Sequence, residues 1–215
     1  MQQSCIVYIV DDDDAVRDSL SLLCESAGLE TECHACSESF LAAYKPSQPG
    51  CLVLDVRMSR MSGTELHTEL NRIGSQLPVI YLTAYGDIPL TVWAMKAGAL
   101  DFLTKPVDPT ALLDRVQTAI RQCLLQRTQL QQRANLQQCL AQLTPREAEI
   151  MTLALSGHAN KVIANHLNIS YRTVELHRSR ILQKTNTKNL LELTQLLTDF
   201  NLTLSPIDIP KTHEA

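Results

Sequence analysis

Four consecutive aspartates, Asp11 to Asp14, directly follow the apolar run Ile6–Val10. A run filled with β-branched residues is typical of a parallel strand that is buried on both faces. Acids at the carboxyl end of such a strand lie where open α/β sheets bind ligands. Because clustered carboxylates repel one another unless a cation neutralises them, Asp11 and Asp12 predict a site for a hard divalent cation. The alternative is that the acids cap a helix beginning near Ala15, and this interpretation is favoured for the last two of the four.

Three further apolar runs each end in a small functional group. They are Cys51–Leu54 before Asp55, Val79–Leu82 before Thr83, and Phe102-Leu103 before Thr104-Lys105-Pro106. If all four runs are parallel strands, their carboxyl ends share one edge of a sheet. We therefore expect acids, a hydroxyl and an amine to gather at that edge.

Composition limits the class of protein. No apolar stretch of the 215 residues approaches the roughly 18 to 20 that a membrane span needs. The first residues lack the charged and apolar regions of a signal peptide, so we expect a cytoplasmic protein with seven reduced cysteines. The spacing of Cys33 and Cys36 is that of a redox or metal motif, but no second pair completes a zinc site, which favours ordinary packing.

The charge is unevenly distributed. Residues 1–120 carry eight Lys and Arg against 16 Asp and Glu, whereas residues 143–191 carry seven against three. Residues 121–142 hold three Arg and no acid. An acidic first half and a basic second block predict two domains, the second facing a polyanion.

Residues 1–120 alternate strand and helix patterns. With a short strand over Glu30–His34, there are five strands between helices predicted over 15–27, from 37, over 62–70, over 88–97 and from 109. This alternation predicts an α/β fold with a doubly wound, five-stranded parallel sheet.

Residues 121–142 hold eight Gln and neither Gly nor Pro, which favours a helical linker. A coiled-coil dimer and an unstructured linker are the alternatives. Structure restarts at Thr144-Pro145-Arg146-Glu147, a capping box with Pro at the first helical position. Residues 143–200 then predict a small all-α domain of four helices, beginning near 145, 161, 171 and 189. Residues 201–215 are expected to form a poorly ordered tail.

These patterns resemble the two-component response regulators of the NarL/FixJ branch, which join a CheY-like receiver to a LuxR-type helix-turn-helix domain. The receiver part of the resemblance rests on Asp11-Asp12, Asp55, Thr83, Ala97-Gly98-Ala99 and Lys105-Pro106. The DNA-binding part rests on Leu143 to Glu147, Asn160-Lys161, Ile163-Ala164 and Thr173 to Arg178. The resemblance covers nearly the whole chain.

The resemblance implies that Asp55 accepts a phosphoryl group from a sensor histidine kinase. It implies that Mg²⁺ or Mn²⁺ is held by Asp11, Asp12, Asp55 and the main-chain carbonyl of Arg57. Lys105 would pair with the phosphoryl group and Thr83 would donate its hydroxyl to it, while Phe102 turns inward. The protein would then be a phosphoryl acceptor and transcriptional regulator, not an enzyme, and would form a homodimer on phosphorylation.

For the second domain, the resemblance implies a recognition helix from Tyr171 to Lys184 in the major groove of promoter DNA. The residues expected to contact base edges are Glu175, Leu176, Arg178 and Ser179. Those expected to contact phosphates are Lys161, Arg172, Thr173 and Lys184. A small helical protein-binding module is the alternative.

The chain departs from the family pattern at Ser59, where a proline usually stands, and at Tyr85, where a small residue or His is frequent. Trp93 on the fourth predicted helix suggests a contact surface, with burial in the core as the alternative. Two other classes of protein remain. An aspartate-dependent phosphatase would need a cap domain or a second catalytic Asp two residues after the nucleophile, where this chain has Arg57. A constitutive DNA-binding protein would need a degenerate receiver, which the retained acids argue against.

Overall fold

A computed structural model describes residues 4–84 and 97–202. It divides the chain into two compact units, Met1–Thr128 and Gln129–Ala215. The predictions for Tyr85, for Trp93 and for most of the helix over 88–97 lie outside the described residues. Within the described ranges, no helix is both long enough and apolar enough to cross a lipid bilayer.

The first unit contains one parallel sheet of five strands. The strands are β1 (Ile6–Val10), β2 (Glu30–His34), β3 (Gly50–Asp55), β4 (Val79–Thr83) and β5 (Asp101–Thr104). Their order in the sheet is β2-β1-β3-β4-β5, and each neighbouring pair is parallel. The predicted doubly wound, five-stranded sheet is thus confirmed, and β1, β3 and β4 are buried almost throughout, as their apolar runs require.

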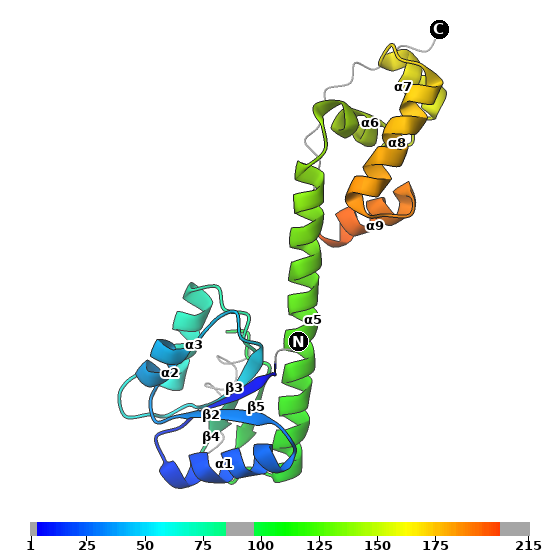
Figure 1. Ribbon diagram of the computed structural model, residues 1–215. Coiled ribbons are helices and arrows are strands. Elements are labelled where there is room, and N and C mark those ends of the chain that lie inside the picture. Colours follow the sequence, from blue (N-terminus) through cyan, green and yellow to red (C-terminus); the bar gives the residue numbers. More distant parts are fainter. Residues whose placement is uncertain (1–3, 85–96, 203–215) are drawn as a thin grey trace. The chain divides into compact units, whose positions relative to one another are not determined.

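Helices cover both faces of this sheet (Figure 1). One core joins the sheet to α1 (Asp14–Ser26) and to the first turns of α5 (Pro109–Ala141). The other core joins it to α2 (Ser37–Ala43) and α3 (Gly63–Arg72). Asp13 caps α1, because its side chain accepts the N–H groups of Ala15 and Val16.

Strand register aligns the carboxyl ends of the strands. Val10 of β1 lies beside Leu54, and Asp55 lies beside Leu82. The loop after β3 returns tightly over this edge, since a Cβ on Gly63 would lie 2.2 Å from the carbonyl oxygen of Asp55. The absence of a side chain at Gly63 therefore lets α3 begin directly behind Asp55.

Cys33 and Cys36 were expected to pack in the protein interior, and for Cys33 this prediction is wrong. Cys33 lies on β2, the outermost strand beside β1, and is exposed rather than packed, whereas Cys36 is half-buried. Both are free thiols. The side chains of β2 are less buried than those of the central strands β1 and β3, so a side chain on this strand can reach water.

The second unit is all helical. It contains the end of α5 with α6 (Pro145–Leu155), α7 (Asn160–His166), α8 (Tyr171–Thr185) and α9 (Leu190–Asp199). Its core includes residues from all five helices, among them Leu136, Ile150, Ile163, Ile181 and Leu193. Leu136 and Leu140 of α5 thus belong to the packing of this unit, although they precede the boundary expected at residue 143.

Local signals define the ends of these helices. Thr144 and Glu147 form the predicted capping box at the start of α6. Asn168, at φ 53°, makes the left-handed turn between α7 and α8, and Ser170 caps α8 by accepting the N–H of Thr173. Asn tolerates this conformation better than most residues, so the turn sets α8 against α7.

Candidate functional site

Three carboxylates meet at the carboxyl edge of the sheet. Asp11, Asp12 and Asp55 each offer an oxygen within 4.8 Å of the other two. Asp11 is 1% exposed and Asp55 is 6% exposed, whereas Asp12 faces solvent. Two acids reach this edge from β1 and one from β3, as the strand ends predict.

The Lys105 ammonium lies between the two buried acids. Its Nζ is 2.6 Å from Asp11 Oδ2 and 2.6 Å from Asp55 Oδ1. Lys105 follows β5 directly and reaches across the sheet edge to the acids of β1 and β3. One cation thereby offsets part of the repulsion between two carboxylates.

The same arrangement shifts the ionisation of these groups. Burial raises the pKa of Asp55 above its usual value, and the hydrogen bond and charge of Lys105 offset only part of that effect. Burial also acts to lower the pKa of Lys105, but its hydrogen bonds to Asp11 and Asp55 outweigh burial and raise it. Lys105 is therefore charged at neutral pH, and Asp55 gains from any further cation beside it.

Main-chain N–H groups orient the three acids, and sequence patterns did not identify them. Asp11 Oδ1 accepts the N–H of Asp13 at 3.0 Å. Asp55 Oδ2 accepts the N–H of Arg57 at 2.8 Å. Asp12 Oδ2 accepts the N–H of Ser59 at 3.1 Å. Because every residue except proline has an N–H, no residue type marks such donors in advance.

The donor set fits a hard divalent cation. Its side-chain groups are carboxylate oxygens, the ligands that Mg²⁺ and Mn²⁺ prefer, and one of them is open to solvent. Within residues 4–84 and 97–202, this is the one cluster of three or more acidic, His or Cys side chains close enough to share an ion. The geometry therefore favours a cation at the edge that also carries Lys105.

Two other predicted residues lie beside the cluster on β4 and β5. Thr83 ends β4 and is 9% exposed. Phe102 of β5 is paired in register with Tyr81 and is 36% exposed. Phe102 is thus exposed to solvent in this structure.

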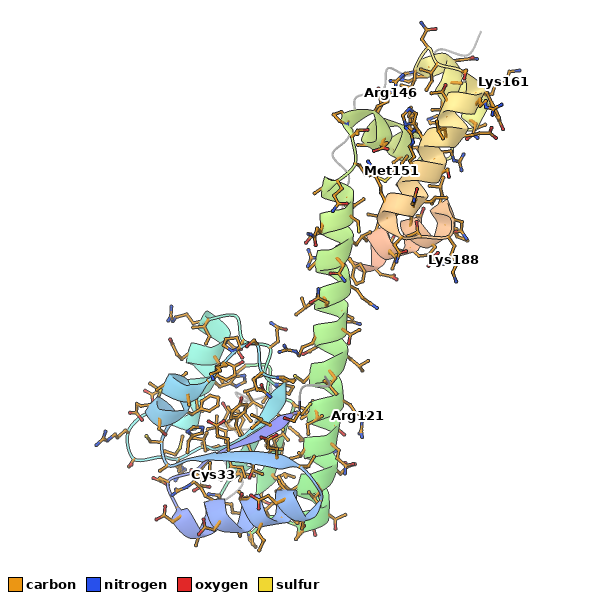
Figure 2. All side chains as sticks on the ribbon, in the orientation of Figure 1. Cys33, Arg121, Arg146, Met151, Lys161 and Lys188 are labelled. Atoms are coloured by element: carbon orange, nitrogen blue, oxygen red, sulfur yellow. The ribbon has the colours of Figure 1, made fainter. Side chains whose placement is uncertain are left out.

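A second candidate site is the exposed face of α8 in the other unit. Six exposed residues share one side of the helix, Arg172, Glu175, Leu176, Ser179, Arg180 and Gln183, and Tyr171 at its first turn is also exposed. Val174 and Ile181 are buried on the opposite side. Arg180 and Gln183 were not among the predicted contacts, although a helical repeat counted from Arg172 would have found them. Lys161 of α7 and Lys188 before α9 are also exposed (labelled in Figure 2).

Three of the predicted DNA contacts also have partners inside the unit. Arg178 donates to the side-chain oxygen of Asn160. The hydroxyls of Thr173 and Ser170 lie 2.8 Å apart. Lys184 Nζ lies 2.7 Å from Glu147 Oε2, and the Glu147 side chain is 4% exposed. These contacts give the three residues roles in holding α8 in place.

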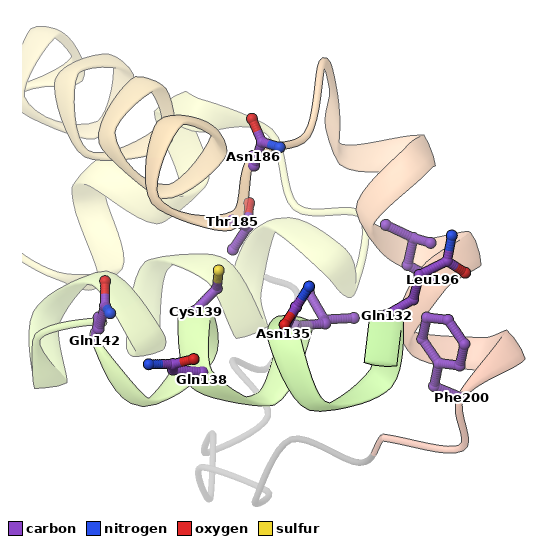
Figure 3. A pocket seen from close by; sticks show the side chains of 10 residues that line it. Gln132, Asn135, Gln138, Cys139, Gln142, Thr185, Asn186, Leu196 and Phe200 are labelled. Carbon is purple, nitrogen blue, oxygen red and sulfur yellow. The ribbon is translucent and has the colours of Figure 1, made fainter. Parts of the chain in front are cut away.

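A cavity of about 530 Å³ lies between the end of α5, the end of α8 and α9 (Figure 3). Five carboxamide side chains and Cys139 line it together with Leu136, Thr185, Leu196 and Phe200. None of its lining residues is charged, so it offers a phosphate no ion pair.

Comparison with protein families finds one family match for each part of the chain that contains a candidate site. Residues 7–117 match the response regulator receiver domain, and residues 141–197 match the bacterial regulatory proteins of the luxR family. The chain belongs to the two-component response regulators of the NarL/FixJ type. The resemblance inferred from the sequence is thereby confirmed, and this response regulator is a DNA-binding transcriptional regulator controlled by phosphorylation.

Two relatives match this chain over most of its length. The transcriptional regulatory protein FixJ of Azorhizobium caulinodans is 42% identical over 196 residues, which cover 91% of this chain and 93% of FixJ. The response regulator TodT of Pseudomonas putida is 38% identical, over 90% of this chain and 86% of TodT.

Solved structures agree with this assignment. The response regulator StyR matches with a TM-score of 0.82 and 42% identity, over 91% of this chain and 99% of StyR. Full-length FixJ from B. japonicum matches with a TM-score of 0.57 and 35% identity, over 94% of this chain and 100% of that protein.

Proposed function

We propose that Asp55 is the phosphoryl acceptor of this response regulator, and that a sensor histidine kinase is the donor. A carboxylate oxygen of Asp55 attacks the phosphorus of the kinase phosphohistidine. A P–O bond forms, the P–N bond breaks and the imidazole leaves, which gives an acyl phosphate. The observation that supports this role is the position of Asp55, buried at the strand edge between Lys105 and two further acids.

Asp11, Asp12, Asp55 and the main-chain carbonyl of Arg57 would hold Mg²⁺ or Mn²⁺. The cation neutralises charge on the oxygens of the transferred group. Lys105 already lies 2.6 Å from Asp55, and it would pair with the phosphoryl group once that group is attached. Burial of Asp55 strengthens each of these electrostatic contacts.

The acyl phosphate would change the β4–β5 region of the receiver. Thr83 would move to donate its hydroxyl to a phosphoryl oxygen, and the exposed Phe102 would turn its ring inward. The added charge of about −2 would act beside this region, and such a local change can shift an interface where a region has two arrangements. The response would be a homodimer, placing two α8 helices on adjacent half-sites of promoter DNA.

Labelling tests the acceptor. With Mg²⁺ and an acyl phosphate donor, the full chain should gain one phosphoryl group, Asp55→Asn should gain none, and EDTA should block the gain. Asp13→Asn is a matched control, because Asp13 caps α1 and is not one of the three clustered acids. Equal labelling of Asp55→Asn and the unmodified protein would exclude Asp55 as the acceptor.

Sedimentation of the labelled and unlabelled full chain tests the dimer. Dimerisation of the unmodified protein should increase when it is phosphorylated. Dimerisation of Asp55→Asn should be the same with and without the acyl phosphate donor. A labelled protein that stays monomeric at tens of micromolar would exclude dimerisation as the response.

On DNA, we propose that the exposed face of α8 reads base edges through Glu175, Leu176 and Ser179. Arg172 and Lys161 would contact phosphates, which position the protein without reading sequence. Leu176 is 51% exposed, and an apolar side chain so placed suits the methyl group of thymine.

Binding measurements with the full chain separate these two classes of contact. The full chain is used because Leu136 and Leu140 complete the core of the second unit. Lys161→Ala should weaken binding to all sequences, whereas Leu176→Ala should change sequence preference by about 1–3 kcal/mol at one base pair. If Leu176→Ala weakened binding to every sequence equally, α8 would not be reading bases through this residue.

A further inference from the structure

The three acids at the carboxyl edge of the sheet differ in burial and in the number of contacts that orient them. Asp11 and Asp55 are buried, and both contact Lys105. Asp12 is exposed, and within residues 4–84 and 97–202 its side chain has one hydrogen bond, from the N–H of Ser59. Asp12 is therefore the acid whose orientation depends most on a single contact.

This contact leaves the second oxygen of Asp12 available. Ser59 N–H donates to Oδ2 at 3.1 Å, so rotation of the carboxylate is restricted while Oδ1 takes no hydrogen bond from the described residues. An exposed carboxylate that must be ordered on binding loses rotamer freedom at that moment. A donor that orders it beforehand removes part of that cost.

The loop that presents Ser59 is anchored at both ends. The N–H of Gly63 donates to the carbonyl of Val56 at 3.1 Å, which closes the loop between β3 and α3. The hydroxyl of Ser37 donates to the carbonyl of Met61 at 2.9 Å, which ties the loop to α2. These contacts do not involve the side chain or N–H of Ser59. They hold the loop in place, and the loop in turn holds the N–H of Ser59 beside Asp12.

We propose that the main-chain N–H of Ser59 positions Asp12 for the divalent cation, and that this donor strengthens cation binding. The proposal rests on the proposed function, because it assigns a group to the same site. Proline usually stands at this position in the family, and proline has no N–H. The chain thus has a donor for Asp12 that the usual family residue cannot supply.

Cation titration of the full chain tests this role, with Mn²⁺ as the probe and water proton relaxation as the measurement. Ser59→Pro removes the N–H, and Ser59→Ala, which keeps it, is the reference. The Mn²⁺ dissociation constant of Ser59→Pro should be roughly fivefold weaker than that of Ser59→Ala, the effect of one net hydrogen bond. Equal affinities would overturn the proposal.

Two further measurements separate the hydrogen bond from loop stiffness. Ser59→Gly keeps the N–H and loosens the loop, so it should bind Mn²⁺ like Ser59→Ala. If Ser59→Gly were instead as weak as Ser59→Pro, loop conformation and not the donor would be responsible. Without any cation, Asp12→Asn should move the amide proton resonance of Ser59 upfield, and an unmoved resonance would contradict the hydrogen bond.

Asp12→Asn also distinguishes failure of this proposal from failure of the site. If Asp12→Asn weakens Mn²⁺ binding while the Pro and Ala variants bind equally, the acid site stands and only the role of Ser59 fails. If Asp12→Asn leaves Mn²⁺ affinity unchanged, Asp12 does not hold the cation, and the metal site of the proposed function loses that ligand as well.

Discussion

Replacing Lys184 by Met should destabilise the second unit without altering its contacts with DNA. Lys184 Nζ lies 2.7 Å from Glu147 Oε2, and the same oxygen accepts the N–H of Thr144 at 2.8 Å. Glu147 is buried, so removal of Lys184 leaves a carboxylate charge with less compensation. A phosphate-binding lysine would instead be free to reach the nucleic acid.

The size of the effect can be worked from the acid. Hydrogen bonds from Lys184 first, and then from Thr144, lower the pKa of Glu147 from 4.5 to about 2. At about 1.4 kcal/mol per pKa unit, all of these contacts together contribute at most about 3.5 kcal/mol. Lys184 shares the acid with Thr144 and its side chain is 33% exposed, so we expect its loss to cost about 2 kcal/mol.

Hydrogen exchange followed by mass spectrometry measures this cost in the full chain. Peptides from α6 and α8 should lose protection equivalent to about 2 kcal/mol in Lys184→Met, and receiver peptides should be unchanged. The slope of log affinity for DNA against log salt should stay the same, because no phosphate contact is lost. Lys188→Met is the control, since Lys188 is exposed and its ammonium has no ion pair within the described residues.

The opposite pattern would refute this reasoning. If Lys184→Met reduced the salt slope by about one and left exchange in α6 and α8 unaltered, its ammonium would be binding a phosphate. The ion pair with Glu147 would then contribute nothing to the fold.

Three further predictions concern the receiver and the capping box. Burial lowers the pKa of His67 below 6.5, so the folded state binds a proton at His67 less readily than the unfolded chain does. The free energy of unfolding of the receiver should therefore fall as pH drops below about 6.5, and His67→Phe should remove that dependence in urea titrations. Gly63→Ala should destabilise the receiver by more than about 2 kcal/mol in the same assay, because its Cβ would meet the Asp55 carbonyl; a smaller loss would mean that the loop can shift freely. Thr144→Ala removes one half of a capping box and should cost about 1 kcal/mol of protection in α6, whereas Thr194→Ala, on an exposed site of α9, should not.

The receiver fold follows from local patterns. Short β-branched runs alternate with amphipathic segments, and this alternation is enough to predict a parallel sheet with helices on both faces. Asp11, Asp55 and Lys105 could be predicted to lie together, since each follows a strand and parallel strands end at one edge. The pairing of Lys105 with both acids, and not with one, needed the strand order β1-β3-β4-β5.

In the second unit, sequence patterns located the helices better than the roles of their side chains. Thr144, Glu147 and Ser170 act within four residues of their own helix starts, so their caps are visible in the sequence. Lys184 and Glu147 are 37 residues apart, and nothing in their local spacing distinguishes an internal ion pair from a phosphate contact. The positive charge of Lys184 suits either role.

Sequence patterns alone therefore predicted the features that depend on neighbours along the chain: the strands, the helix ends, and the acids and lysine at the carboxyl edge of the sheet. The tertiary structure alone decided which groups orient those acids. The N–H groups of Arg57 and Ser59 do so, and a main-chain N–H has no residue signature apart from the absence of proline. Their function depends on direction and distance across the folded sheet edge, which no one-dimensional pattern records.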